Sequence, residues 1–181
     1  MADKTVSRKA DHREVTLKED VEKGWSGLSE VRFVHEAVTL LDWEEVDLRT
    51  KFINHDVSAP LMITAMTGGY PEAENINRRL AKVCQDKGIA MGLGSQRAML
   101  KRPEMVKTYR VRDVAPDIPL VGNIGFAQLR EYDDRTIEGM LRDVDADYLA
   151  VHLNTLQEIV QPEGDRDFKG SLERLRDLSQ D

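Results

Sequence analysis

The stretch Leu149–Glu158, LAVHLNTLQE, joins an apolar segment directly to a run of polar side chains. With the two residues before it, the apolar part has the length and composition of a buried β-strand. His152, Asn154, Gln157 and Glu158 gather at its carboxyl end, which is where ligands bind in α/β folds. The pattern has two readings: a functional site, or a core histidine followed by the first turn of a helix.

Three further apolar segments end in the same way. They span residues 59–65, 89–93 and 118–122, and each has the length of a strand buried on both faces. The four strand ends read MTGGY (66–70), GSQR (94–97), GNIG (122–125) and HLNTLQE (152–158). We therefore expect four parallel strands whose polar ends meet along one edge.

Helical patterns alternate with these strands. Pro71 suits a first helical position and Gly88 a C-terminal cap, which predicts a helix between them. The other helices are expected at 103–114, with Arg102, Arg110 and Arg112 on its solvated face, at 126–129 and 137–144, and at 171–178 with Ser171 as N-cap. Residues 161–165 are expected to form a loop.

The predicted fold class is α/β, with the strand–helix order of the TIM (β/α)8 barrel family. Only four of the eight units are expected, a half-barrel, because a complete barrel typically needs about 250 residues and no fifth strand follows the last helix. Two short strands, at 46–48 and 51–53, are expected before the first strand of the half-barrel. We predict an N-terminal arm with a hairpin or helical cap over residues 1–58, and the half-barrel over 59–181.

The composition narrows the function. The net charge of −7 and the pI of about 5.2 disfavour nucleic acid as a partner. Cys84 is the single cysteine, so a disulfide within the chain is impossible and a cysteine-based metal site is excluded. The chain start has no apolar signal segment, and no apolar run approaches about 18 residues. We therefore expect a cytoplasmic protein without a membrane segment.

The strand ends predict a site for a flat ring and an anion. The neutral groups are Thr67, Ser95, Asn123 and Asn154, with Gly68 and Gly69 allowing close approach of backbone N–H groups. The positive groups are Arg97 and His152, together with Arg8, Lys9 and His12 near the start, which are read either as a solvated terminus or as an arm that closes on a phosphate. Such a set suits a heteroaromatic cofactor and a diphosphate.

Glu158 is the one carboxylate expected beside these cations. Next to an anionic ligand it needs a cation between them, which indicates a Mg²⁺ ligand that bridges to phosphate oxygens. The alternative is an acidic residue in the first turn of a helix, where the macrodipole favours it. The Gln157 amide cannot act as a conventional acid or base, but it can orient a group or line a pocket.

With these residues in place, the chain resembles the first half of the type 2, FMN-dependent isopentenyl-diphosphate isomerases. The matching motifs are Arg8-Lys9-x-x-His12, Ala65–Gly69 (AMTGG), Gly94–Arg97 (GSQR), Gly122–Gly125 (GNIG) and His152–Glu158 (HLNxxQE). They occur in family order and cover nearly the whole chain. One departure is Thr155, where the family usually has proline.

The resemblance implies a role for each matched residue. Gln157 and His152 would be catalytic. Arg8, Lys9, His12, Ser95, Gln96, Arg97, His152, Asn154 and Gln157 would bind the substrate; Ala65, Met66, Thr67, Gly68, Ser95 and Asn123 would contact FMN; and Glu158 would hold Mg²⁺. The implied reaction interconverts isopentenyl and dimethylallyl diphosphate in isoprenoid biosynthesis, with FMN reduced by NADPH and its N5 region handling the proton.

Two expectations follow from the resemblance to only half of a barrel. Without the later loops, which grip the FMN phosphate in such barrels, the chain alone is expected to be a weak enzyme or inactive. It is expected to form a homo-oligomer or to pair with a second half-barrel. The alternatives are a non-catalytic half-barrel that acts as a remnant or assembly partner, and another FMN-dependent barrel oxidoreductase such as an α-hydroxy-acid oxidase.

Overall fold

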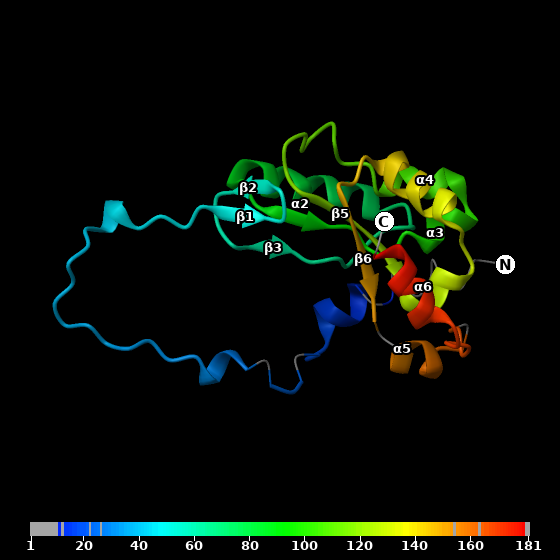
Figure 1. Cartoon of the computed structure of the whole chain (residues 1–181), viewed down its shortest axis with the longest axis horizontal. Helices are drawn as coiled ribbons and strands as arrows, with labels where there is room; N and C mark the ends of the chain where they lie inside the picture. Colours follow the sequence, from blue (N-terminus) through cyan, green and yellow to red (C-terminus); the bar gives the residue numbers. More distant parts are fainter. Residues whose placement is uncertain are drawn as a thin grey trace.

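A computed structural model describes residues 11, 13–21, 23–25, 27–153, 155–162 and 164–179. Its main sheet has four parallel strands in chain order (Figure 1). They are β3 (Met62–Ile63), β4 (Ala90–Gly92), β5 (Leu120–Gly125) and β6 (Tyr148–His152). A separate antiparallel hairpin, β1 (Thr50–Phe52) and β2 (His55–Val57), precedes them. The predicted α/β class with a parallel sheet is confirmed.

Helical segments connect these strands. In chain order they are η1 (Leu28–Glu30), η2 (Trp43–Glu45), α2 (Ala73–Lys87), α3 (Arg97–Lys101), η3 (Pro103–Thr108), η4 (Phe126–Arg130), α4 (Asp134–Val144), α5 (Thr155–Val160) and α6 (Ser171–Leu178). Residues 11 and 13–18 are also helical. Each strand of the main sheet is thus followed by a helix, the connection that adjacent parallel strands require.

The core lies between the main sheet and its helices. Leu120 and Ile124 of β5 are fully buried in the core cluster with Met140 and Val144 of α4. Because side chains alternate along a strand, Asn123 lies on the opposite face of the sheet. His152 of β6 lies on this same face, because the parallel register pairs Asn123 with Ala150 and Gly125 with His152.

The predicted helix at 103–114 is wrong. Only Pro103–Thr108 of this segment is helical, as the 3-10 helix η3, and residues 109–114 are not helical. Arg102 before it is extended, with φ −142° and ψ 92°, as expected of a residue before proline. Arg112 is not solvated: it donates to the Asp145 and Ile118 carbonyl oxygens, each at 2.7 Å, and contacts Asp147 Oδ2 at 2.6 Å. It therefore ties the loop after η3 to the start of β6.

Several predicted boundaries also shift. β5 continues through Gly125, which had been assigned to the following loop, while residues 46–48 form no strand. Gly88 is confirmed as the cap of α2, with φ 62° and its N–H directed to the last-turn carbonyls. The cap of α6 is Gly170, with φ 84°, and not Ser171, whose buried Oγ finds no partner among the described residues.

The N-terminal part divides into a docked hairpin and an exposed segment. Tyr148 of β6 anchors the hairpin, because its hydroxyl lies 2.8 Å from His55 Nδ1 and accepts from the Asn54 N–H at 3.2 Å. Residues 28–51 are exposed throughout and run in a wide loop away from the sheet (Figure 1). Phe33 is 97% and Leu40 94% exposed, so apolar side chains in this segment lack a packing surface within the described chain.

Candidate functional site

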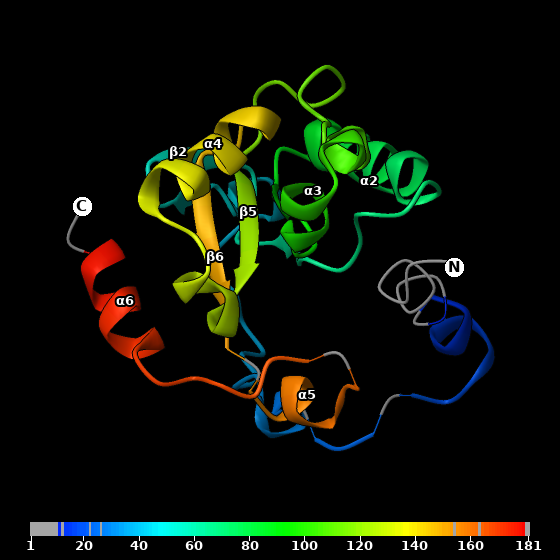
Figure 2. The same ribbon diagram turned by 90° about the vertical axis from the view of Figure 1, so that its right-hand side faces the viewer.

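The site lies at the carboxyl ends of β5 and β6. Figure 2 shows the arrowhead of β5 pointing toward α5, with η4 beside it. His152 at the end of β6 and Glu158 in α5 line one small pocket with Gly125 and Phe168. The predicted substrate-binding residue His152 and the predicted metal ligand Glu158 therefore line the same pocket, although they are six positions apart in the chain.

Asp165 links this pocket to the end of β4. Its Oδ2 accepts a hydrogen bond from Gln128 Nε2 at 2.5 Å and lies 3.2 Å from the Arg97 guanidinium. Its backbone N–H donates to Glu158 Oε2 at 3.0 Å. Arg97 and Glu158, which the sequence predicted on separate strand ends, therefore meet through one carboxylate residue that the sequence had assigned only to a loop.

Gln96 has a structural role. Its side chain is fully buried, donates from Nε2 to the Met140 carbonyl and to Met99 Sδ, each at 3.3 Å, and accepts from the Asn123 N–H at 3.0 Å. These bonds join the end of β4 to β5 and α4. Because the amide is enclosed by the chain's own residues, these contacts account for Gln96 without a ligand, and its predicted role in substrate binding stays a prediction.

The glycines after β3 make room for other parts of the chain. A Cβ at Gly68 would lie 2.0 Å from Tyr109 Cε1, and the Gly69 N–H donates to Thr108 Oγ1 at 2.8 Å. Packing against the chain's own residues thus accounts for glycine at positions 68 and 69, and a contact of Gly68 with FMN stays a prediction. The two glycines allow the loop to pack on η3 and Tyr109, and this packing fixes the position of Thr67.

The other residues expected to contact a flat ring follow β3 and β4 or, in the case of Asn123, lie within β5. Met66 is 77% exposed, and Thr67 Oγ1 donates to the Tyr70 hydroxyl at 3.1 Å. Both line an apolar cavity of about 190 Å³ with Leu17 of the N-terminal helical residues. Ala65 is exposed, Ser95 is half-buried, and Asn123 is 8% exposed, with no hydrogen bond from its side chain to another described residue.

Burial of Tyr109 makes the protein sensitive to alkaline pH. Its hydroxyl donates to the Ser95 carbonyl at 2.8 Å, and desolvation raises its pKa, partly opposed by Arg102. Above about pH 10 the unfolded tyrosine loses its proton while the folded one keeps it. The contribution of Tyr109 to the free energy of unfolding is therefore constant below pH 10. Above pH 10 the free energy of unfolding falls by about 1.4 kcal/mol per pH unit.

Urea titrations between pH 8 and 11 test this expectation. Tyr109→Phe should lose about 1 kcal/mol at pH 8 through the missing hydrogen bond, and its free energy of unfolding should fall less steeply above pH 10 than that of the wild type. Equal slopes in the two proteins would contradict a linkage through Tyr109.

Four of the predicted site residues lie outside the described residues: Arg8, Lys9, His12 and Asn154. Gln157 is described and half-buried, in the same helix as Glu158. Sequence reasoning missed Gln128 and Asp165. The one signal in the sequence is Gly164 directly before Asp165, because glycine is used where the backbone approaches another part of the chain closely.

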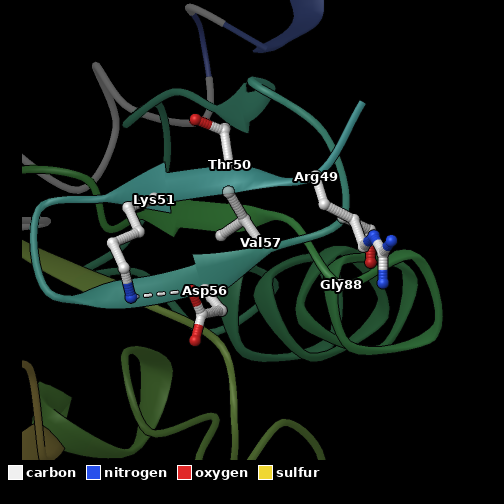
Figure 3. A pocket seen from close by; sticks show the side chains of 7 residues that line it. Arg49, Thr50, Lys51, Asp56, Val57 and Gly88 are labelled. Atoms are coloured by element: carbon white, nitrogen blue, oxygen red, sulfur yellow. Dashed lines mark hydrogen bonds and ion pairs between the residues drawn. The ribbon is translucent and has the colours of Figure 1, made fainter. Parts of the chain in front are cut away.

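A larger open cavity lies elsewhere and has a different character. It measures about 570 Å³ and is lined by the β1–β2 hairpin and Gly88 (Figure 3). Lys51 contacts Asp56 at 2.8 Å across the hairpin, as the dashed line in Figure 3 marks, and Arg49 is paired with Asp47 at 2.7 Å. Its charged side chains are exposed and mutually neutralised, so we do not assign the site to it.

Fold and site together define an α/β protein with a polar ligand site at the carboxyl ends of a parallel sheet, the organisation of many α/β enzymes. Comparison with known proteins makes this specific, although no family model matches the chain. Isopentenyl-diphosphate delta-isomerase from Methanothrix thermoacetophila is 45% identical over 174 residues, covering 96% of this chain and 49% of that protein. The isomerase of the same name from Halobacterium salinarum is 45% identical over 179 residues, 97% of this chain and 50% of its own length.

A third relative of the same name, from Pyrococcus furiosus, is 43% identical over 185 residues, 97% of this chain and 47% of its own length. The chain is thus homologous, over nearly all of its residues, to isopentenyl-diphosphate delta-isomerases, and it spans about half the length of the curated relatives it matches. In the described part of the chain, no helix has the length and apolar content that a membrane crossing requires.

Proposed function

We propose that this chain supplies part of the active site of an isopentenyl-diphosphate isomerase, which interconverts isopentenyl and dimethylallyl diphosphate in isoprenoid biosynthesis. The observation that carries the proposal is that Glu158 lines a pocket with His152 and is joined to Arg97 through Asp165. It occurs in a chain 45% identical to proteins named for that reaction. A carboxylate beside two cationic or protonatable groups suits a metal-bridged diphosphate.

The finer fold proposal is a TIM half-barrel over residues 59–181, preceded by an arm and hairpin over 1–58. Sequential parallel strands joined by helices support it. The same arrangement has two unpaired edges, at β3 and β6, which a second half-barrel or a second copy would cover. The exposed apolar residues of 28–51 support such a partner, because large apolar surfaces usually mark an interface.

Glu158 fits a Mg²⁺ site of the kind that uses one carboxylate and substrate phosphates. Its Oε2 accepts from the Asp165 N–H, and its Oε1 accepts no hydrogen bond from a described residue. No group of three histidine, cysteine or acidic side chains suited to a metal occurs in the described ranges. The chain would therefore contribute one ligand and leave the others to phosphate oxygens and water.

FMN fits the strand ends of β3 to β5 through neutral contacts. Asn123 offers an amide on the face of the sheet opposite Leu120 and Ile124, and Thr67 and exposed Met66 offer a hydroxyl and an apolar surface. Ala65, Gly68 and Ser95 complete the proposed contacts. Reduced FMN, with NADPH as the reductant, would supply the proton chemistry, and the chain's residues would orient the substrate.

The remaining site residues act on the substrate. Arg97, Ser95 and His152, with the arm residues Arg8, Lys9 and His12, would bind the diphosphate, so that it stays fixed while the prenyl chain reacts. Gln157 and Asn154 would line the prenyl chain. Gln157 and His152 are the proposed catalytic residues, Gln157 by orienting the reacting carbons and His152 by contacting the substrate at the end of β6.

Purification under reducing conditions tests the proposal. With FMN, NADPH and Mg²⁺ present, we expect binding of isopentenyl diphosphate but turnover at least 100-fold below that of the full-length Methanothrix relative assayed in parallel. Absence of isopentenyl diphosphate binding would contradict the function, and turnover equal to the relative would contradict the incomplete site. Size-exclusion chromatography with light scattering measures whether copies associate.

The open sheet edges favour one alternative, a non-catalytic half-barrel that serves as an assembly partner. It is distinguished by flavin absorbance: an assembly partner would retain no FMN and show no turnover at any protein concentration. An α-hydroxy-acid oxidase is less well supported, because Glu158 beside His152 suits a metal-bound diphosphate better than a substrate carboxylate.

A further inference from the structure

We propose that Asp165 is a positioning residue that fixes Arg97 and Glu158 relative to each other for binding of a Mg²⁺–diphosphate. The inference rests on the proposed function, and it adds a residue that neither the motifs nor the relatives' names single out. Asp165 itself need not touch the ligand, since its polar groups are directed to the chain's own residues.

The geometry of Asp165 joins the ends of three strands. Arg97 begins α3 after β4, Gln128 lies in η4 after β5, and Glu158 lies in α5 after β6. The Asp165 carboxylate accepts from Gln128 Nε2 at 2.5 Å and contacts the Arg97 guanidinium at 3.2 Å, while its N–H donates to Glu158 at 3.0 Å. One residue thus sets the spacing between the proposed phosphate-binding cation and the proposed metal ligand.

The loop that carries Asp165 is packed tightly against α5. A Cβ at Gly164 would lie 1.9 Å from the Glu158 carbonyl oxygen, so only glycine allows this approach. The Gly164 N–H donates to the Gln161 carbonyl and the Gln161 N–H to that of Gln157, each at 3.1 Å. Asp165 therefore extends from a fixed turn, which is what positioning of another side chain requires.

The Arg97–Asp165 ion pair is partly buried, which strengthens the attraction between the two charges. Their side chains are 19% and 28% exposed, so the pair is screened less than a surface ion pair. Tyr132 lies close enough that both charges influence the pKa of its phenol, which desolvation raises. Without the Asp165 carboxylate, the Arg97 guanidinium would lose its fixed direction, whereas the backbone N–H that donates to Glu158 Oε2 is kept in Asp165→Asn.

Calorimetric titration with inorganic pyrophosphate and Mg²⁺ tests the inference. We expect Asp165→Asn to weaken binding at least 10-fold and Asp165→Glu to recover part of the loss. Asp167→Asn is the matched control, because Asp167 lies on the same loop but pairs with Arg130 at 2.9 Å on the surface and is 72% exposed. It should bind pyrophosphate as the wild type does.

A double-mutant cycle separates positioning from general stability. In an Arg97→Gln background, Asp165→Asn should change pyrophosphate affinity less than 2-fold. Wild-type or tighter binding by Asp165→Asn, or the full loss persisting without Arg97, would overturn the inference.

The Arg97 Nη2–H resonance provides a readout that does not need a ligand, because Nη2 lies 3.2 Å from Asp165 Oδ2. In ¹⁵N NMR spectra it should exchange slowly with water in the wild type and in Asp167→Asn, and at least 10-fold faster in Asp165→Asn. If the wild type binds no pyrophosphate, the proposed function fails while this measurement still decides the role of Asp165. Unchanged exchange in Asp165→Asn would overturn it.

Discussion

Replacement of Gly94 by alanine is expected to cost at least about 3 kcal/mol in the free energy of unfolding, the upper end of overpacking effects. A Cβ at this position would lie 2.4 Å from the Thr67 carbonyl oxygen and 2.8 Å from the Thr67 nitrogen. These are backbone atoms, and Thr67 O already accepts from the Gly94 N–H and from Asn77 Nδ2. The clash therefore cannot be relieved by rotation of a side chain.

Urea denaturation followed by circular dichroism measures this loss. Gly139→Ala is the matched control, because Gly139 lies inside α4 with nothing within 4 Å of its Cβ position. It should stabilise the chain by about 0.5–1 kcal/mol, since alanine favours a helix interior. A cost below about 1 kcal/mol for Gly94→Ala would contradict the close contact between the ends of β3 and β4.

Replacement of Glu158 by glutamine should weaken Mg²⁺-dependent binding of isopentenyl diphosphate by at least about 10-fold, the effect expected for a lost charged ligand. Glutamine keeps an oxygen that can accept from the Asp165 N–H, so the loop should stay in place and the loss should come from the metal. Calorimetric titrations of isopentenyl diphosphate, one series with Mg²⁺ and one with EDTA, separate the loss of affinity that depends on the metal from the loss that does not.

The control for this change is Glu138→Gln. Glu138 is exposed on α4, where it pairs only loosely with Arg142 at 3.9 Å, and its replacement should leave diphosphate affinity unchanged. If Glu158→Gln loses as much affinity in EDTA as in Mg²⁺, Glu158 is not a metal ligand. The alternative, an acidic residue that only favours the start of α5, would then be the better account.

The features that could be predicted from the sequence are those that depend on local residue pattern. Apolar segments ending in polar residues predicted the four parallel strands, and Gly88 predicted the end of α2, because strand burial and helix capping depend on neighbouring residues. The motif His152–Glu158 placed a histidine and a carboxylate at one strand end. The pocket they share follows from a short connection between β6 and α5.

Tertiary structure alone decided the contacts between distant residues. Gln96 looked like a ligand-binding amide, but its neighbours Met140 and Asn123 enclose it. Gly68 looked like a ligand approach, but Tyr109 occupies the space beside it. Asp165 looked like a loop residue, yet it joins Arg97 to Glu158. A polar residue or a glycine can either contact a ligand or pack against the rest of the chain. The residues that surround it in the folded protein decide between these two roles, and local sequence does not show them.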